Sequence, residues 1–240
     1  MTHRFYLLQQ LDKEIIVIKD RATVHQMRNV LKLRKGEKVA FFSDKPEYAG
    51  FDFVAELKNI EGIGASGQAV FMLREKTENA RELSKKMILY QSLIKKDKFE
   101  WVLEKATEVG VSEIVPVISA RAEKKSLNAE RCWIILKEAA EQSGRAVVPK
   151  LYNPLSFERA LNMAVSSGAK TYFASESEKE NMIHGAGDRQ INLFIGPEGG
   201  WEEREIFAAG RANFEVVSLG RLTLRSETAA VVASYVLLWE

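Results

Sequence analysis

Short runs rich in β-branched and aromatic residues, typical of strands, dominate the first seventy or so residues of the chain. One helical pattern interrupts them, with apolar residues three or four positions apart from about Ala22 to Leu33. Many short strands at close intervals predict a small β-barrel or sandwich. The predicted strands are Arg4–Leu8, Glu14–Ile18, Lys38–Phe42, Phe51–Leu57 and Ala69–Leu73.

From about Lys85 onward, apolar runs suited to buried strands alternate with amphipathic helical patterns. The first of these helices is predicted to start at Asp97, as an N-cap paired with Glu100, and to stop at Gly110. Strands that alternate with helices predict a parallel sheet covered on both faces. Further strands are expected at Met87–Leu93, Ile114–Ile118, Thr171–Ala174, Ile191–Ile195 and Val216–Leu219, and further helices at Ala129–Ser143, Ser156–Ala164, Glu202–Ala209 and Glu227–Trp239. We therefore predict an α/β protein with a β-rich domain at residues 1–73 and a larger α/β domain at residues 74–240.

The composition adds few constraints on function. Apolar residues make up 46% of the chain and charged residues 28%, which is ordinary for a globular protein and excludes a disordered or fibrous one. A single cysteine, Cys132, excludes a disulfide framework, and the three histidines show no metal-ligand spacing, so no metal is expected. The apolar stretch Ala229–Trp239 is too short to span a bilayer, and the start lacks a signal-peptide pattern, so we expect a cytoplasmic protein.

The strongest chemical signal is the segment Gly196-Pro-Glu-Gly-Gly200, which joins an apolar strand to a helix with an acidic first turn. Ligands of open α/β sheets bind at the carboxyl ends of strands, where such a loop emerges. The segment is neither a dinucleotide fingerprint nor a P-loop, and Glu202 and Glu203 would repel a phosphate at this helix start. Taken alone, it is equally compatible with a simple tight turn.

A second glycine-bearing loop, Leu219–Glu227, follows another predicted strand about twenty residues later. The two loops would form opposite walls of one crevice, in which leucines line the apolar part while Arg225 and Glu227 supply charge. Alternatively, Glu227 complements the helix dipole and Arg225 is a solvated loop residue.

Positive charge is concentrated in the N-terminal domain, although the formal net charge of the whole chain is only +2. The basic segment Lys19–Lys38 holds seven lysines and arginines against two acidic residues, and Arg28, Lys32 and Lys35 repeat at helical spacing. The basic segment is compatible with a phosphate-binding stripe. An ordinary solvated surface would have the same composition.

Another group of hydrogen-bonding residues, Glu138, Gln142 and Arg145, would share one helix end.

Taken in order, several segments resemble the family of ribosomal RNA small subunit methyltransferase E over nearly the whole chain. Two departures concern RNA contact: Lys32 replaces the usual arginine, and Ala120 replaces the glutamate of a Ser-Glu-Arg motif. The matching segments are His3-Arg-Phe5, His25 with Val30–Leu33 and Gly36-Glu37, Trp101–Val111, Glu138–Arg145, Ile195–Trp201 and Leu219–Ala229.

The resemblance implies a PUA-like β-barrel at residues 1–73 that binds RNA and a SPOUT α/β domain with a deep trefoil knot at residues 74–240. It implies a homodimer that methylates N3 of a uridine in the 16S rRNA of the small ribosomal subunit, with S-adenosyl-L-methionine as donor. The cofactor-binding residues carried over are Ala174, Ser175, Ile195, Gly196, Gly199, Gly200, Leu219, Gly220 and Leu224.

Neutral uridine N3 must lose a proton before it can accept a methyl group, so the site needs a base and a group that stabilises the uracil oxyanion. We expect Arg225 to stabilise the oxyanion and Glu198 or Glu227 to act as the base or to orient it. Contacts to RNA are expected from Arg4, His25, Arg28, Lys32, Arg34 and Arg145. Two alternatives remain open: another SPOUT enzyme that modifies tRNA or a ribose 2′-hydroxyl, or a non-catalytic ribosome-assembly factor that binds RNA.

Overall fold

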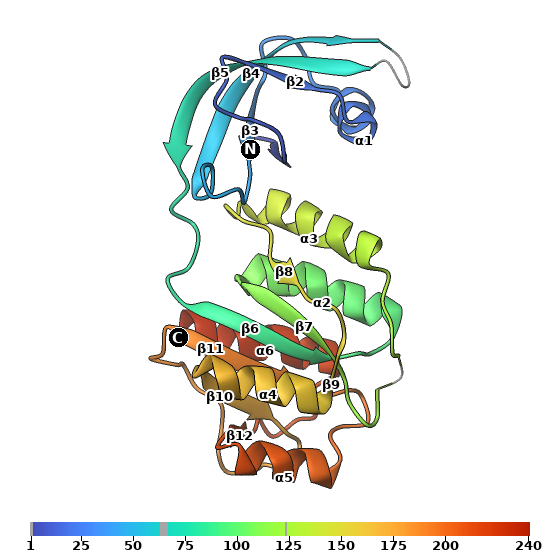
Figure 1. Cartoon of the computed structure of the whole chain (residues 1–240), viewed down its shortest axis with the longest axis vertical. Coiled ribbons are helices and arrows are strands. Elements are labelled where there is room, and N and C mark those ends of the chain that lie inside the picture. The colour runs from blue at the N-terminus through green and yellow to red at the C-terminus, as the bar shows by residue number, and fades with distance from the viewer. Residues whose placement is uncertain (1, 63–66, 123) are drawn as a thin grey trace. The chain divides into compact units, whose positions relative to one another are not determined.

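The structure, a computed structural model, describes residues 2–62, 67–122 and 124–240 (Figure 1). The chain divides into two compact units: the first comprises Met1–Glu82 with Gly144–Val147, and the second comprises Leu83–Ser143 with Val148–Glu240. The expected domain boundary after residue 73 falls inside a strand that continues to Glu78. The sequence pattern ended too early because residues 74–78 are polar, yet their backbone pairs with the strand that begins at Phe51.

A five-stranded mixed sheet, in the order β1-β3-β4-β5-β2, forms the framework of the first unit. Strand β1 pairs with β3 in parallel, whereas the other neighbours are antiparallel. Register shifts between Val54 and Ala55, and between Leu57 and Asn59, interrupt the long hairpin of β4 and β5. Such irregularities bend a strand pair and increase its twist. The strands are β1 Arg4–Tyr6, β2 Ile15–Ile18, β3 Lys38–Phe42, β4 Phe51–Glu61 and β5 Gln68–Glu78.

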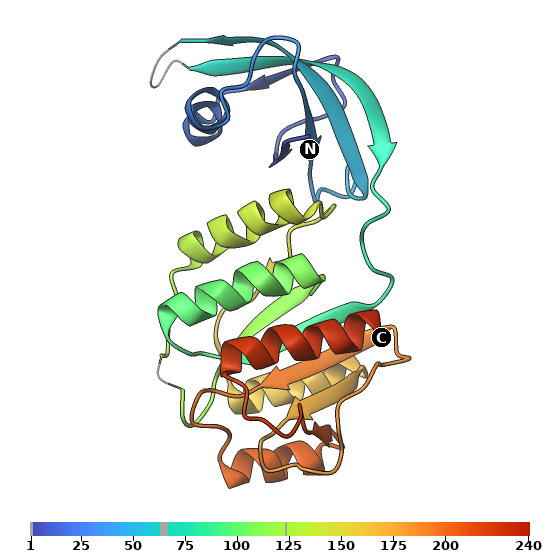
Figure 2. The same cartoon turned by 180° about the vertical axis from the view of Figure 1, so that it is seen from behind.

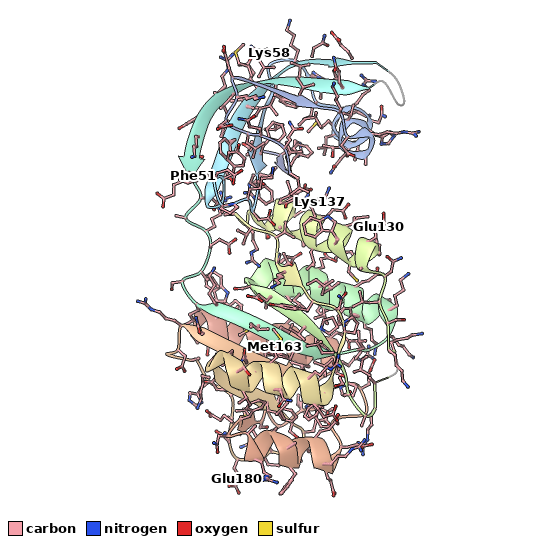
Figure 3. All side chains as sticks on the ribbon, viewed as in Figure 1. Phe51, Lys58, Glu130, Lys137, Met163 and Glu180 are labelled. Atoms are coloured by element: carbon pink, nitrogen blue, oxygen red, sulfur yellow. The ribbon has the colours of Figure 1, made fainter. Side chains whose placement is uncertain are left out.

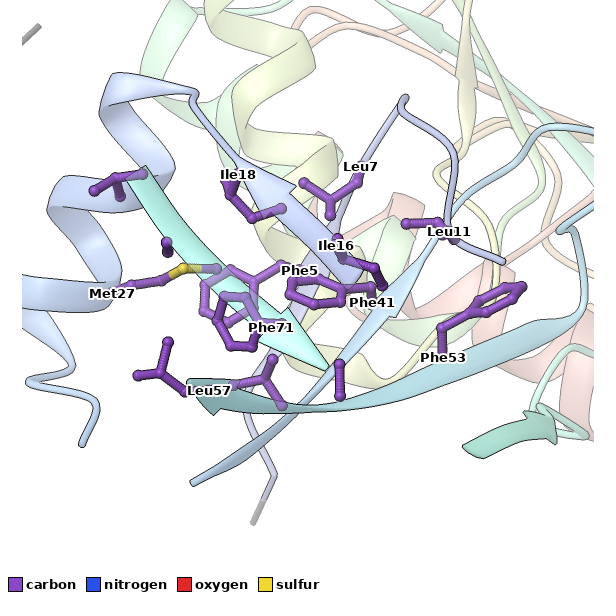
Figure 4. Close-up of a cluster of buried hydrophobic side chains, with 14 of the residues drawn as sticks. Phe5, Leu7, Leu11, Ile16, Ile18, Met27, Phe41, Phe53, Leu57 and Phe71 are labelled. Atoms are coloured by element: carbon purple, nitrogen blue, oxygen red, sulfur yellow. The ribbon is translucent and has the colours of Figure 1, made fainter. Parts of the chain in front are cut away.

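The core of the first unit lies on the face of this sheet that is also covered by its short helix (Figure 4). Phe41 and Phe71 meet edge to face, with ring centroids 4.9 Å apart, and both are fully buried. Met27 reaches the same cluster from the helical segment. Alternating side chains from each strand thus converge, as the period-two pattern predicts for a sheet with one buried face.

The helical segment of this unit is shorter than the sequence pattern predicts. Helix α1, Arg21–His25, begins at the N-cap Asp20 and widens into a π-helical turn, η1, over Gln26–Val30. The amide of Leu31 bonds to the carbonyl of Gln26, and the chain then leaves the helix. Lys32 has a positive φ of 51°, so it and Lys35 do not continue the helical face on which the repeat had placed them.

The second unit is a parallel α/β domain. Its bounds match the predicted alternation closely, with two short added strands, β8 and β9. The strands are β6 Lys86–Ser92, β7 Glu113–Ile118, β8 Lys150–Leu151, β9 Leu155–Ser156, β10 Lys170–Ala174, β11 Gln190–Ile195 and β12 Glu215–Val217. The helices are α2 Lys96–Val109, α3 Ala129–Ser143, α4 Phe157–Ser167, α5 Glu203–Arg211 and α6 Ser226–Trp239.

The sheet of the second unit has the order β12-β10-β11-β6-β7-β8, with β9 also paired to β7. Every pairing is parallel, and α4 and α5 cover one face while α2, α3 and α6 lie on the other (Figures 1 and 2). Met163 marks α4, and Glu130 and Lys137 mark α3, among the side chains of Figure 3. Because β10 pairs in parallel with both β11 and β12, the carboxyl ends of these three strands lie at one edge of the sheet.

The predicted start of α2 is wrong. The N-cap of α2 is Lys95, which makes no side-chain capping bond, so Asp97 lies inside the first turn. The capping box occurs instead at α5, where the side chain of Glu205 accepts the backbone N–H of Glu202 at 2.9 Å. The predicted stop of α2 is correct, because Gly110 ends it with a left-handed φ of 107° that favours glycine.

Buried ion pairs reinforce the first unit. The guanidinium of Arg4 contacts Asp52 at 2.6 Å, and its side chain is 7% exposed. Arg145 contacts Glu82 at 2.9 Å, and its side chain is 6% exposed. The carbonyl of Arg145 in turn accepts a hydrogen bond from Arg4. Arg145 lies past the end of α3, so it does not share a helical face with Glu138 and Gln142 as the sequence had suggested.

Glu82 holds the segment Gly144–Val147 on the first unit. Burial alone would raise the pKa of its carboxyl group. The hydrogen bonds and charge of Arg145, together with the backbone amides of Ala146 and Val147, outweigh that effect and hold the pKa of Glu82 below its usual value of 4.5. A carboxyl group with a lowered pKa in the folded state stabilises the fold above its unfolded-state pKa. That stabilisation is lost as the pH falls through the folded-state pKa.

The Glu82→Gln substitution should therefore lower the free energy of unfolding by about 2 kcal/mol near neutral pH, because Arg145 loses its charged partner. The difference from the wild type should shrink as the pH falls below 4.5. Urea denaturation followed by circular dichroism at a series of pH values measures it. Glu78→Gln is the matched control, since Glu78 ends β5 and is exposed. Equal behaviour of the two variants at every pH would contradict the assignment.

Candidate functional site

A cavity of about 230 Å³ opens at the carboxyl ends of β10, β11 and β12 in the second unit. We call it the glycine-loop cavity. Three segments line it: residues 174–176 with Lys179, residues 195–201 except Gly199, and residues 218–226, together with Ala229 of α6. This is the edge of a parallel sheet at which ligands bind in open α/β folds.

The structure brings together eight of the nine residues that the sequence analysis assigned to a cofactor. Gly199 is the exception: it does not line the cavity, and its carbonyl accepts a hydrogen bond from the guanidinium of Arg121 at 2.7 Å. The eight lining residues are Ala174, Ser175, Ile195, Gly196, Gly200, Leu219, Gly220 and Leu224. They combine backbone groups with a few apolar side chains, which suits a small ligand that has both polar and apolar parts.

Trp201 joins two walls of the glycine-loop cavity. Its indole N–H donates to the carbonyl of Ala174 at 2.9 Å, which links the end of β10 to the loop after β11. A Cβ atom at Gly196 would lie 3.1 Å from the indole nitrogen, closer than side chains normally approach. Glycine at position 196 therefore allows the loop to lie directly on the tryptophan ring.

A chain of hydrogen bonds connects this loop to the centre of the sheet. Ser226, the first residue of α6, donates its hydroxyl to the carbonyl of Gly196 at 2.5 Å and accepts a bond from Gln91 at 3.0 Å. Gln91 lies near the end of β6 and is fully buried. The start of α6, the loop after β11 and strand β6 are thus held at one point. Sequence reasoning missed both Gln91 and Ser226, because neither has a local pattern that indicates a partner.

The three residues expected to act in catalysis lie at this end of the domain. Glu198 and Arg225 line the glycine-loop cavity, whereas Glu227, in the first turn of α6, does not. Arg225 is exposed, and within the described ranges its guanidinium has no ion-pair partner. Lys98 of α2 contacts both Glu198 and Glu227. Sequence reasoning assigned no role to Lys98.

The basic residues predicted to contact RNA all belong to the first unit, but they fall into two groups. His25, Lys32 and Arg34 are exposed, and Arg28 is half-buried and donates to the carbonyl of Gly62. Arg4 and Arg145 are buried in the ion pairs described above.

In residues 2–62, 67–122 and 124–240, no group of three histidine, cysteine or acidic side chains is arranged to hold a metal ion. Across the same ranges, no helix combines the length and apolar character needed to cross a membrane.

Comparison with known proteins identifies relatives over the whole chain. The family model described as an RNA methyltransferase domain matches residues 81–238. Ribosomal RNA small subunit methyltransferase E of Synechocystis is 31% identical and aligns with 97% of this chain and 76% of its own. The Bacillus subtilis protein of the same name is 29% identical, over 88% of this chain and 84% of its own.

A solved structure has the same fold. The crystal structure of ribosomal RNA small subunit methyltransferase E from Neisseria gonorrhoeae bound to S-adenosyl methionine superposes with a TM-score of 0.82. The two chains are 28% identical, and the alignment covers 98% of this chain and 95% of that one.

The contact between Gly196 and Trp201 predicts the effect of an added methyl group. Gly196→Ala should weaken binding of S-adenosyl methionine, used as the probe, by about tenfold, because the new Cβ displaces the loop from the indole ring. Titration calorimetry measures the change. Gly187→Ala is the matched control, since a Cβ there meets nothing within 4 Å, and it should bind as the wild type does. Wild-type affinity in Gly196→Ala would show that the loop position does not govern binding.

Proposed function

The chain belongs to the family of ribosomal RNA small subunit methyltransferase E, and on this basis we propose that it methylates N3 of a uridine in 16S rRNA with S-adenosylmethionine as donor. The observation that carries the proposal is the glycine-loop cavity at the carboxyl edge of the parallel sheet. It is formed by the loops that the family motifs occupy.

The residues of this cavity fit the proposed donor. Gly196 brings bare backbone against the Trp201 ring, and Gly200 and Gly220 have positive φ values of 68° and 130° that let their loops turn without a side chain. Leu219 and Leu224 supply apolar surface. We propose that these residues, with Ala174, Ser175 and Ile195, hold S-adenosylmethionine, which when bound supplies an activated methyl group. Gly199 would act through its backbone conformation only.

The remaining task of the protein is to position the uracil and manage its charge. Removal of the N3 proton leaves negative charge on the two uracil oxygens, so a cation placed nearby lowers the barrier. Arg225 is the proposed cation, because it is exposed at the cavity and has no ion-pair partner among the described residues. Glu198 and Glu227 are the proposed proton acceptors.

The first unit is proposed to bind the RNA as a PUA-like domain. His25, Lys32 and Arg34 are exposed on one short segment, and the half-buried Arg28 lies between His25 and Lys32 in the π-helical turn. Such a cluster can neutralise RNA phosphates. We propose that Arg4 and Arg145 support RNA binding indirectly by stabilising the unit, since carboxylates already hold both guanidinium groups.

We also propose that the second unit is knotted and that the enzyme is a cytoplasmic homodimer. The insertion of β11 between β6 and β10, followed by the attachment of α6 to the loop after β11, supports the knot. Support for the dimer comes from α6, where Val232, Tyr235 and Trp239 remain exposed. Trp101 of the neighbouring helix α2 is exposed as well, so this apolar helix pair lacks a cover within the described chain.

Transfer of radiolabelled methyl groups to small ribosomal subunits tests the function directly. We expect the label in 3-methyluridine of the 16S rRNA. Arg225→Ala should reduce the rate about 100-fold while leaving S-adenosylmethionine affinity unchanged, because the guanidinium acts on the transition state.

Arg211→Ala, at the far end of α5, is the control and should keep the wild-type rate. Label in another nucleoside would indicate a different enzyme of this fold, and binding of RNA without any transfer would indicate an assembly factor. A normal rate in Arg225→Ala would exclude the proposed role of this residue.

The exposed basic residues predict a specific salt dependence. Lys32→Glu combined with Arg34→Glu should weaken RNA binding about tenfold or more and flatten the salt dependence by the equivalent of about two phosphate contacts. Filter binding at several salt concentrations measures both effects. The control Lys13→Glu with Arg189→Glu makes the same change in net charge at other exposed positions. If both double variants bind equally weakly, only net charge matters and the proposed RNA contacts are wrong.

A further inference from the structure

A lysine and two glutamates from three separate elements meet beside the glycine-loop cavity. We call this group the Lys98 cluster. The amino group of Lys98, in the first turn of α2, lies 3.2 Å from Glu198 Oε1 and 3.8 Å from Glu227 Oε1. Glu198 belongs to the loop after β11 and Glu227 to the first turn of α6. Their side chains are 26%, 27% and 13% exposed, so Glu227 is the most buried of the three.

The two carboxylates are not equivalent. Glu198 accepts a hydrogen bond from Lys98. In contrast, Glu227 Oε2 is buried and has no hydrogen-bond partner among the described residues. A buried carboxylate oxygen without a donor costs free energy, and native proteins rarely retain one without a reason. A ligand that brings an N–H group would satisfy it. Uracil N3 carries such a group, and Glu227 directly follows Arg225 and Ser226, which line the cavity.

Lys98 lies within ion-pair distance of both carboxylates. The two negative charges repel each other, and a shared cation offsets that repulsion. Among the described residues, Lys98 of α2 is the cation that contacts Glu227, Glu198 reaches the same lysine from the loop after β11, and Arg225 is the N-cap residue of α6. The placement of both acids therefore depends on Lys98.

Resting on the proposed function, we propose that Lys98 is a positioning residue that fixes Glu198 and Glu227 so that Glu227 Oε2 accepts the N3 proton of the target uridine. The proton passes from N3 to the Glu227 carboxylate, which becomes a neutral acid. The N3 electron pair forms the new N–C bond as the C–S bond breaks, and the electrons of that bond remain on sulfur as a neutral thioether leaves. Glu227 then returns its proton to water.

Three variants test the role of Lys98 in single-turnover methylation of small ribosomal subunits between about pH 6 and pH 9. Lys98→Met should lower the rate at pH 7 at least tenfold and move the rise of the rate to higher pH, because the acids lose their shared cation. Affinity for S-adenosylmethionine and the midpoint of thermal unfolding should stay unchanged. Lys98→Arg should restore most of the rate.

Lys96→Met is the matched control, since Lys96 lies in the same helical turn and its ion pair with Glu100 is 3.7 Å long and exposed at the lysine. It should leave the rate and its pH dependence at wild-type values. A wild-type pH profile in Lys98→Met would overturn the positioning role. So would a loss in Lys98→Met that comes with an equal loss of S-adenosylmethionine binding, since that outcome indicates a structural role.

A double-substitution cycle distinguishes the proton acceptor. Glu227→Gln should lower the rate about 100-fold, and adding Lys98→Met should cause little further loss, because the two residues act on the same proton. If the rate losses of Glu227→Gln and Lys98→Met multiply in the double variant, the proposed coupling between the two residues is wrong. If the wild-type protein transfers no methyl group at all, the proposed function itself fails. If the wild type is active and the Lys98 variants match it, only the role of Lys98 fails.

Discussion

The hydroxyl of Ser226 holds the functional end of the second unit together, because it donates to the carbonyl of Gly196 and accepts from the amide of Gln91. Gln91 is on β6, a central strand of the sheet, so these hydrogen bonds tie the glycine loop to that strand. Trp201 makes the second attachment, to the end of β10. Two short contacts on a loop of bare backbone thus place the cavity walls, and the added bulk of one methyl group at Gly196 is enough to disturb them.

The two cations near the cavity differ in their ion-pair partners. Arg225 has no ion-pair partner in the described residues, while Lys98 is shared between Glu198 and Glu227. In the proposed reaction, Arg225 would be available to the uracil anion while Lys98 holds the two acids in place. Both cations lie near the start of a helix, Lys98 in the first turn of α2 and Arg225 at the N-cap of α6. The start of α6 also forms part of the cavity wall.

The sequence predicts the alternation of strands and helices in the second unit well, because buried parallel strands and amphipathic helices each leave a strong period. It also indicates the cavity walls, since glycine-rich loops after strands have a specific location in such sheets. Contacts between distant segments leave no such signal. Lys98 and Glu198 are one hundred positions apart, and Glu82 reaches Arg145 across 63 residues. The sequence analysis also missed the π-helical turn that ends at Val30. The spacing of apolar residues does not show which backbone carbonyl accepts the hydrogen bond of each amide.

A comparison of Arg4 with Arg34 shows that the number of basic residues in a sequence does not by itself predict RNA binding. Arg4 and Arg34 are equally basic in the sequence, yet Arg4 is committed to Asp52 and covers the ring of Phe42 at 4.4 Å, whereas the side chain of Arg34 is exposed. A guanidinium held by a buried carboxylate contributes little attraction to a phosphate, because its field is already neutralised locally and its removal from the carboxylate is costly. In the proposed RNA-binding role, phosphate affinity would therefore come from exposed cations such as Lys32 and Arg34, and the buried pairs would stabilise the unit that carries them.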